Sequence, residues 1–239
     1  MCQSLFLEYS KKWQFMIIFS FRLIKMFNKT QLIEALKSEG SIPIDDWILD
    51  RLISSGTEMT VPAKGYIVAD GEIDKSLYIT ASGVTKAYFF DGKKESVLGF
   101  SGEGTMTLSP LCMILGRPAF CGFQAVTDCT IIKIEKKDFD SLMHESHAFA
   151  LFMFRMAVSQ LSALELKAQM LSEGDVYANY KKMTRRKMKL DNDGFDPNRP
   201  DQLINIVSSK DIASYLGITQ SYLSNIRKAI HQEEKNKSK

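Results

Sequence analysis

The 239-residue sequence contains only three histidines and four cysteines, which limits the chemistry it can support. His144, His147 and His231 all lie outside the segments with strand patterning, so a histidine-based metal site on a barrel would lack ligands. The cysteines show no Cys-x-x-Cys spacing, which argues against a zinc or iron–sulfur centre. We therefore expect no metal, no cofactor and no enzymatic activity. Reduced thiols are expected at Cys2, Cys112, Cys121 and Cys129.

The sequence also lacks a run of apolar residues near its start that is long enough to span a membrane. The largely apolar stretch Trp13–Ile24 covers 12 residues, whereas a spanning helix needs ~20. No small-x-small cleavage site follows it, which argues against a secretory signal. A membrane-surface anchor is the alternative. We expect Met26 to be the natural start, with residues 1–25 an extension of doubtful status. We expect a cytoplasmic protein with no stable membrane association.

Positive charge is unevenly distributed along the chain. The net charge is +3, but residues 173–239 carry 13 Lys and Arg against 9 Asp and Glu, while residues 1–172 carry 18 against 19. The basic excess therefore belongs to the C-terminal third. Such an excess is typical of a module that binds nucleic acid.

The most specific pattern lies in residues 208–228 and indicates two short helices joined by a tight turn. Ser208, followed by Asp211, provides a hydroxyl cap and an acidic group at a helix start. Gly217 falls where that helix should end, because glycine enters the left-handed backbone region without a Cβ penalty. Thr219 can cap the second helix. The inner, apolar positions are Ile212, Ala213, Leu216, Ile218, Leu223 and Ile226.

The outer face of the second helix is polar and suits a DNA major groove. Amide side chains at Gln220 and Asn225 can pair with adenine N6 and N7. An ordinary helical hairpin with a solvated face is the alternative. We favour a helix-turn-helix that reads bases through Gln220, Ser221 and Asn225, with Thr219 and Tyr222 mainly on phosphate. The expected DNA contacts are Ser208, Ser209, Thr219, Gln220, Ser221, Tyr222, Asn225 and Lys228.

The first half of the chain is patterned as short strands separated by Gly-containing turns. Many strands at this spacing predict a sandwich or barrel rather than βαβ units. Two short helices, within 28–38 and 43–53, precede them, and a helix over 136–143 follows. The expected strands are Glu58–Val61, Tyr66–Ala69, Ser76–Ala81, Val84–Phe90, Ser96–Phe100, Phe123–Val126 and Thr130–Ile134.

A long helix is predicted from about Ser146 to Leu171, and Glu173-Gly174-Asp175 is expected to break it. Seven of its apolar residues alternate in steps of four and three, as in a heptad seam. A single buried amphipathic helix is the alternative. We favour a self-paired dimer helix, because helix-turn-helix proteins commonly bind two half-sites as two-fold dimers. The seam consists of Ala150, Phe154, Ala157, Leu161, Leu164, Ala168 and Leu171.

Beyond the seam, we expect a basic helix from Val176 to Leu190 and a short strand at Leu203–Val207. Some of the basic side chains between Lys181 and Lys189 can contact phosphates, although a solvated face is the commoner role of such a run. The charged tail after Ile230 is expected to fray.

This order of segments, with the residues 212–228, resembles the Crp/Fnr family of bacterial transcription regulators. Weaker support comes from Tyr78–Val84 and Ala125–Cys129. The resemblance implies an α+β fold: an N-terminal jelly-roll (double-stranded β-helix) sensor domain, a long dimerisation helix and a C-terminal helix-turn-helix domain. The corresponding ranges are 26–145, 146–172 and 173–239. It also implies a homodimer on a two-fold operator, with double-stranded DNA and RNA polymerase as partners.

The candidate effector pocket departs from the family pattern. Members that bind cyclic AMP hold the ribose with a Gly-Glu-Leu segment and the phosphate with an Arg-Ser or Arg-Thr pair. Here those positions are Met106, Thr107 and Leu108, and Ala119 and Phe120. An anionic phosphate buried without an arginine would be costly, so we predict no response to cyclic AMP. The cysteine cluster of the iron–sulfur members is absent as well.

An apolar ligand provides an alternative function. The segment with Met106, Leu108, Leu111, Met113, Ile114 and Phe120 is apolar where the nucleotide would bind. These side chains can form a sensor for a small apolar molecule or lipid, with DNA binding secondary, or they can simply fill the roll.

Overall fold

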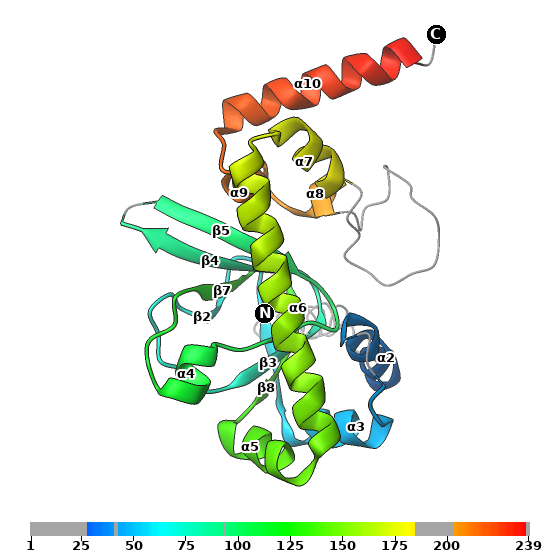
Figure 1. Ribbon diagram of the computed structural model, residues 1–239, viewed down its shortest axis with the longest axis vertical. Coiled ribbons are helices and arrows are strands. Elements are labelled where there is room, and N and C mark those ends of the chain that lie inside the picture. Colours follow the sequence, from blue (N-terminus) through cyan, green and yellow to red (C-terminus); the bar gives the residue numbers. More distant parts are fainter. Residues whose placement is uncertain (1–27, 41–42, 93, 185–202, 238–239) are drawn as a thin grey trace, which may run out of the picture.

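The computed structural model describes residues 28–40, 43–92, 94–184 and 203–237. The predicted N-terminal extension, residues 1–25, lies outside the described residues. A β-roll occupies the lower part of the molecule in Figure 1, a long helix runs along it, and the C-terminal helices lie beyond one end of the roll. This is the α+β architecture predicted from the sequence.

Two four-stranded antiparallel sheets make up the roll, in the orders β1-β8-β3-β6 and β2-β7-β4-β5. All seven strands predicted in the first half of the chain are present, and β6 is an additional one. The strands are β1 (Thr57–Val61), β2 (Tyr66–Val68), β3 (Leu77–Ser82), β4 (Thr85–Asp91), β5 (Lys94–Ser101), β6 (Met106–Thr107), β7 (Gly122–Ala125) and β8 (Cys129–Ile134).

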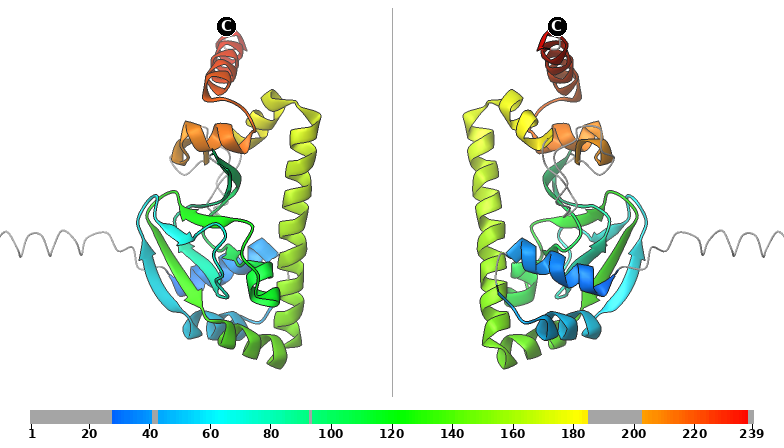
Figure 2. Two further views of the ribbon diagram at one scale, coloured as in Figure 1. Left: turned by 90° about the vertical axis from the view of Figure 1, so that its left-hand side faces the viewer. Right: turned by 90° about the vertical axis from the view of Figure 1, so that its right-hand side faces the viewer.

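The helices pack around and beyond these sheets. Helices α2 (Lys29–Gly40) and α3 (Asp46–Ser55) precede the roll, α4 (Pro110–Leu115) lies within it, and α5 (Lys136–Glu145) follows β8. Helix α6 runs from His147 to Glu173 and spans the length of the roll in both side views (Figure 2). The C-terminal helices are α7 (Val176–Thr184), α8 (Leu203–Ile206), α9 (Ser209–Tyr215) and α10 (Gln220–Lys237).

Strand β3 is buried on both faces, which its sequence does not reveal as simple alternation. Leu77 and Ile79 face a core formed with α2, α3, α5 and α6, while Tyr78 faces the interior of the roll. Strand β8 divides in the same way, with Ile132 on the helix side and Ile131 on the interior side. The helices therefore cover one face of this sheet, and the second sheet closes the other.

Two sequence predictions near the C-terminus are wrong. The segment predicted as a strand at Leu203–Val207 contains the short helix α8, and Val207 N, just after it, donates to Leu203 O at 2.9 Å. A short apolar run does not distinguish strand from helix by itself. The tail expected to fray continues as helix α10 to Lys237, because Ile230 packs on the C-terminal core and Glu233 pairs with Lys181 at 2.9 Å.

Candidate nucleic-acid interface

Helix α9 begins as its sequence predicts. Ser208 is the N-cap, with an extended backbone, and its Oγ accepts a hydrogen bond from Asp211 N at 3.1 Å. The same hydroxyl donates to Asp211 Oδ2 at 2.9 Å. Inside the helix, Ile212 and Ala213 are buried. A polar, capped start therefore leaves Ser208, Ser209 and Lys210 exposed at one end of the helix.

A left-handed glycine makes the turn between α9 and α10. Gly217 has φ +69°, and its N–H donates to Ser214 O at 3.1 Å. Ile218 N then donates to Ala213 O at 3.0 Å. Thr219 Oγ1 accepts from Tyr222 N at 3.2 Å, which caps the start of α10 as predicted. The turn therefore sets the direction in which α10 leaves α9.

Helix α10 presents a polar face to solvent and anchors itself by its other face. Leu223 and Ile226 are buried in a core with α7, α8 and α9. The opposite face carries the side chains that the sequence assigned to base and phosphate contacts, and all of them are exposed: Gln220, Ser221, Tyr222, Asn225 and Lys228, together with Ser224.

One residue that links this site together was not among the predicted contacts. Arg227 donates from Nη1 to Ser209 Oγ at 2.7 Å and from Nε to Tyr180 OH at 3.0 Å. It thereby joins α10 to the start of α9 and to α7. In the sequence Arg227 follows buried Ile226, and helical spacing alone gives no signal that it reaches back 18 residues.

The basic helix α7 is described only as far as Thr184. Lys181 does not extend into open solvent, since it pairs with Glu233 and lies 4.4 Å from the centre of the Tyr177 ring. Lys182 is exposed. The remaining basic residues of the predicted helix lie outside the described residues.

Helix α6 is apolar on two sides. Phe149, Phe152 and Met156 pack into the helix-covered core of the roll. Three further apolar residues widen the stripe in the sequence and were expected on this packing side; of these Met153 is buried there, unlike Leu151 and Val158. Both of those are exposed. Among the described residues, α6 is the one helix whose length and hydropathy would suffice to cross a membrane. Its high content of apolar residues comes from this inner packing face and from the exposed seam.

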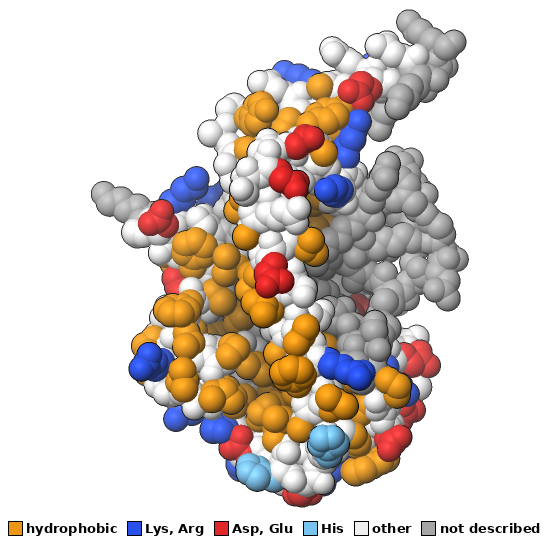
Figure 3. Space-filling view, viewed as in Figure 1, with side chains coloured by type: hydrophobic (Ala, Val, Ile, Leu, Met, Phe, Trp, Pro, Cys, Tyr) orange, Lys and Arg blue, Asp and Glu red, His pale blue; other side chains and the backbone are white. Residues whose placement is uncertain are grey.

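Most of the predicted seam is exposed on the surface of α6. Ala150 is half-buried and the other six seam residues are exposed, including Phe154 at 66% and Leu161 at 56%. Apolar side chains gather over α6 and over the adjoining face of the roll (Figure 3). This surface provides an apolar face of the kind that a second copy could cover.

The residues of the predicted effector pocket have different surroundings. Met106 is buried in the helix-covered core, and its carbonyl accepts from Gln160 Nε2 at 3.0 Å. Leu108 packs against the same core, and Thr107 is half-buried. Ala119 is buried with its N–H donating to Glu72 O at 3.0 Å, whereas Phe120 is 81% exposed.

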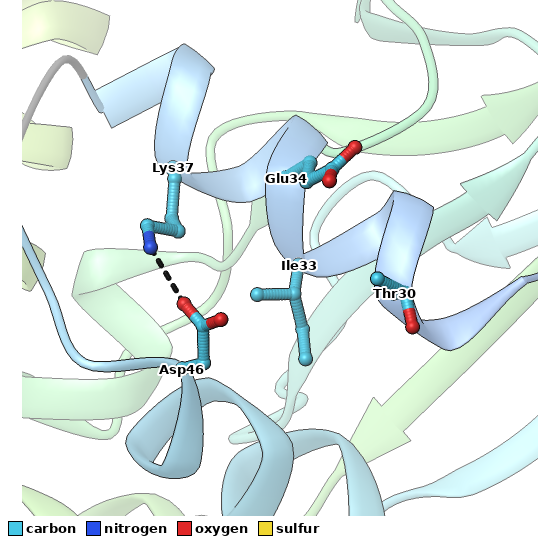
Figure 4. A pocket seen from close by; sticks show the side chains of 5 residues that line it. All are labelled: Thr30, Ile33, Glu34, Lys37 and Asp46. Carbon is cyan, nitrogen blue, oxygen red and sulfur yellow. Dashed lines mark hydrogen bonds and ion pairs between the residues drawn. The ribbon is translucent and has the colours of Figure 1, made fainter.

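A pocket elsewhere on the molecule lies between α2 and α3. Thr30, Ile33 and Glu34 line it from α2, and Lys37 pairs with Asp46 of α3 across it at 2.5 Å (Figure 4). None of these residues was a candidate from the sequence. Within the described part of the chain, no group of three or more His, Cys, Asp and Glu side chains is arranged to hold a metal ion.

Comparison with known proteins now assigns the fold. Residues 58–146 match the family model of the cyclic nucleotide-binding domain. A comparison with curated protein sequences gives no match. Similar solved structures include CLP, described as a c-di-GMP-responsive global regulator of Xanthomonas campestris. It shares 17% identity with a TM-score of 0.63, over 80% of this chain and 93% of that one.

Two further structures agree with this. FixK2 from Bradyrhizobium japonicum shares 17% identity with a TM-score of 0.60, over 75% of this chain and 86% of that one. A variant of CooA from Carboxydothermus hydrogenoformans shares 16% identity with a TM-score of 0.59, over 83% and 84%. Residues 58–146 thus match a cyclic nucleotide-binding domain, and the chain has the fold of the Crp/Fnr regulators that its sequence resembles.

Proposed function

We propose that this protein is a cytoplasmic transcription regulator that binds double-stranded DNA sequence-specifically as a homodimer. The observation that carries the proposal is that α10 has a buried apolar face and an exposed polar face. Its inner face is locked into the C-terminal core through Leu223 and Ile226, while Gln220 and Asn225 stand exposed on the other. A helix held in this way can insert its polar face into a major groove.

Two other features support the same proposal. The exposed apolar seam of α6 offers a self-complementary surface for a two-fold partner, as helix-turn-helix dimers require. The basic excess of residues 173–239 favours association with phosphates. RNA polymerase is the further partner that this kind of regulator implies.

We also propose that cyclic AMP is not its effector. A cyclic phosphate needs a buried arginine or comparable donors, but the two matching positions hold the methyl group of Ala119 and the exposed ring of Phe120. The nearby Arg117 is exposed. The purified protein should show no rise in melting temperature with cyclic AMP, measured beside a cyclic-AMP-binding protein as positive control. A concentration-dependent rise would contradict this part of the proposal.

The apolar-ligand alternative has less support. Met106 and Met113 are already buried in the core, while Ile114 is 72% exposed, so the segment fills the roll on one side and meets solvent on the other. An apolar ligand would have to displace core side chains to bind there.

Selection of random duplexes by the purified protein tests the main proposal. Repeated at several salt concentrations, it should enrich a two-fold symmetric site whose half-sites lie about 10 base pairs apart or a multiple of that. Light scattering on the same sample should give a dimer. A monomer that enriches no sequence over the starting pool would refute the proposal.

A further inference from the structure

The edge of one sheet in the roll is covered by the helix-turn-helix. Strand β5 is the last strand of its sheet, and an edge strand presents unpaired N–H and C=O groups. Helix α9 lies against this edge. Ser214 Oγ accepts a hydrogen bond from Val97 N at 3.0 Å and donates to Glu95 O at 3.3 Å. One serine of α9 therefore satisfies two backbone groups of the sensor roll.

A buried lysine adds a charged connection at the same place. Lys86 Nζ of β4 lies 2.6 Å from Glu95 Oε1 of β5 and 2.9 Å from Asp211 Oδ1 of α9. The three side chains are only 7%, 14% and 15% exposed, respectively. Burial opposes the charge on Lys86, but its hydrogen bonds to Glu95 and Asp211 leave its pKa above the ordinary value. Lys86 thus keeps its charge, and Asp211 is the partner that belongs to the other domain.

Helix α6 joins this contact from a third side. Lys167 Nζ donates to Val97 O at 2.5 Å and to Leu98 O at 3.1 Å, and it lies 4.2 Å from the centre of the Tyr215 ring of α9. Tyr215 in turn packs on Phe100 of β5, with ring centroids 5.6 Å apart. The helix that carries the seam, the edge of the roll and the first helix of the helix-turn-helix are therefore tied together.

The contact leaves the recognition face free. Lys86 contacts the side of α9 that faces β5, and Ser214 lies on that same side. Gln220 and Asn225 of α10 stay exposed. The contact therefore fixes the orientation of α10 relative to the seam. None of the side chains assigned to base contacts takes part in it. In a two-fold dimer, the orientation of α10 sets the distance between the two recognition helices.

We propose that Lys86, although it belongs to the sensor roll, is a positioning residue for DNA binding. It acts through Asp211 by holding the helix-turn-helix in one orientation, so that both recognition helices meet successive half-sites without further ordering. Preorganisation of this kind raises affinity by lowering the cost of ordering on binding. The proposal rests on the proposed function as a dimeric DNA-binding regulator.

The test compares Lys86→Met with Lys86→Arg and with Lys94→Met. Methionine removes the charge, arginine restores it, and Lys94 is an exposed lysine of the same hairpin. Affinities are measured for the selected two-half-site duplex, for a duplex with one base pair added between half-sites, and for a single half-site. Circular dichroism checks that each variant folds. Ser214→Ala, which removes the hydrogen bonds to β5, weakens the same contact and is used if Lys86→Met does not fold.

Lys86→Met should weaken binding to the selected duplex about tenfold, while single-half-site binding stays unchanged. It should also lose the preference for the selected spacing. Lys86→Arg and Lys94→Met should resemble wild type, and Ser214→Ala should resemble Lys86→Met. Equal loss on the single half-site would show a merely structural role and overturn the proposal, as would no loss on either duplex. If wild type itself prefers no sequence, the proposed function fails as well.

Discussion

Leu171, in the last turn of α6, lies against Gly217 in the turn of the helix-turn-helix. A methyl group added to Gly217 would come within 3.1 Å of Leu171 Cδ2. The glycine also has φ +69°, in the region that disfavours residues with a Cβ. The end of the seam helix and the turn between α9 and α10 therefore pack directly on each other.

Gly217→Ala should destabilise the protein for both reasons. The left-handed backbone alone costs an L-residue about 1–2 kcal/mol, and the contact with Leu171 adds to it. Gly174→Ala is the matched control, because Gly174 has φ +71° with nothing near its added methyl group. In urea unfolding, Gly217→Ala should lower the free energy of unfolding more than Gly174→Ala does. Leu171→Ala should remove that difference. Equal effects of the two glycine variants would contradict the role of this contact.

A charge in the seam should dissociate the proposed dimer without unfolding the chain. Leu161 is 56% exposed in a single chain, so Leu161→Glu disturbs no core, but two carboxylates would face each other across the two-fold axis. The dimer dissociation constant should rise about a hundredfold, since like charges in an interface cost several kcal/mol. Ser159→Glu, exposed on α6 but outside the seam, is the control. Sedimentation equilibrium measures both, and a dimer unaffected by Leu161→Glu would place the interface elsewhere.

The two amides of α10 should carry base specificity. Gln220→Ala or Asn225→Ala should cost about 1–3 kcal/mol on the selected duplex and relax the preference at one base pair of each half-site. Gln232→Ala, exposed farther along the same helix, should change neither. Competition binding against single-base variants of the site measures both the affinity and the preference at each base pair. Specificity that survives both substitutions would show that other residues read the bases.

The half-buried Lys167 of α6 should make the stability of the protein depend on pH. Burial lowers the pKa of Lys167 from its ordinary value of 10.5 to about 8. Below pH 8 the group is charged in both the folded and unfolded states. Between about pH 8 and 10.5 the unfolded chain binds more protons than the folded one, so the free energy of unfolding rises with pH.

This contribution can be isolated by substitution. Across that pH range, wild type should gain stability relative to Lys167→Met, because the methionine variant lacks the titrating group. Lys94→Met corrects for the loss of an exposed lysine. The measurement is urea unfolding at closely spaced pH values between 7 and 10.5. Parallel curves for wild type and Lys167→Met would contradict the lowered pKa.

The local structure of the candidate site could largely be predicted from the sequence, whereas the contact between α9 and the roll could not. Ser208 caps α9, Gly217 makes the turn and Thr219 caps α10, because each of these features depends on residues within four positions of one another. Lys86 and Asp211 are 125 residues apart, and neither belongs to a periodic pattern that points to the other. The α4 helix was missed because the residues after its Ser109 cap and Pro110 start, 111–115, are all apolar and show no helical periodicity.

What the sequence by itself determined is the set of local structures: seven strands, the long helix with its terminator Gly174, and the helix-turn-helix. These follow from side-chain periodicity and from backbone preferences, which act over a few residues. Only the tertiary structure decided that β3 is covered on both faces, that Met106 is core and Phe120 exposed, and that α9 caps the edge of β5. These outcomes depend on which distant surfaces meet, because burial and hydrogen-bond pairing are settled by packing between elements rather than within them.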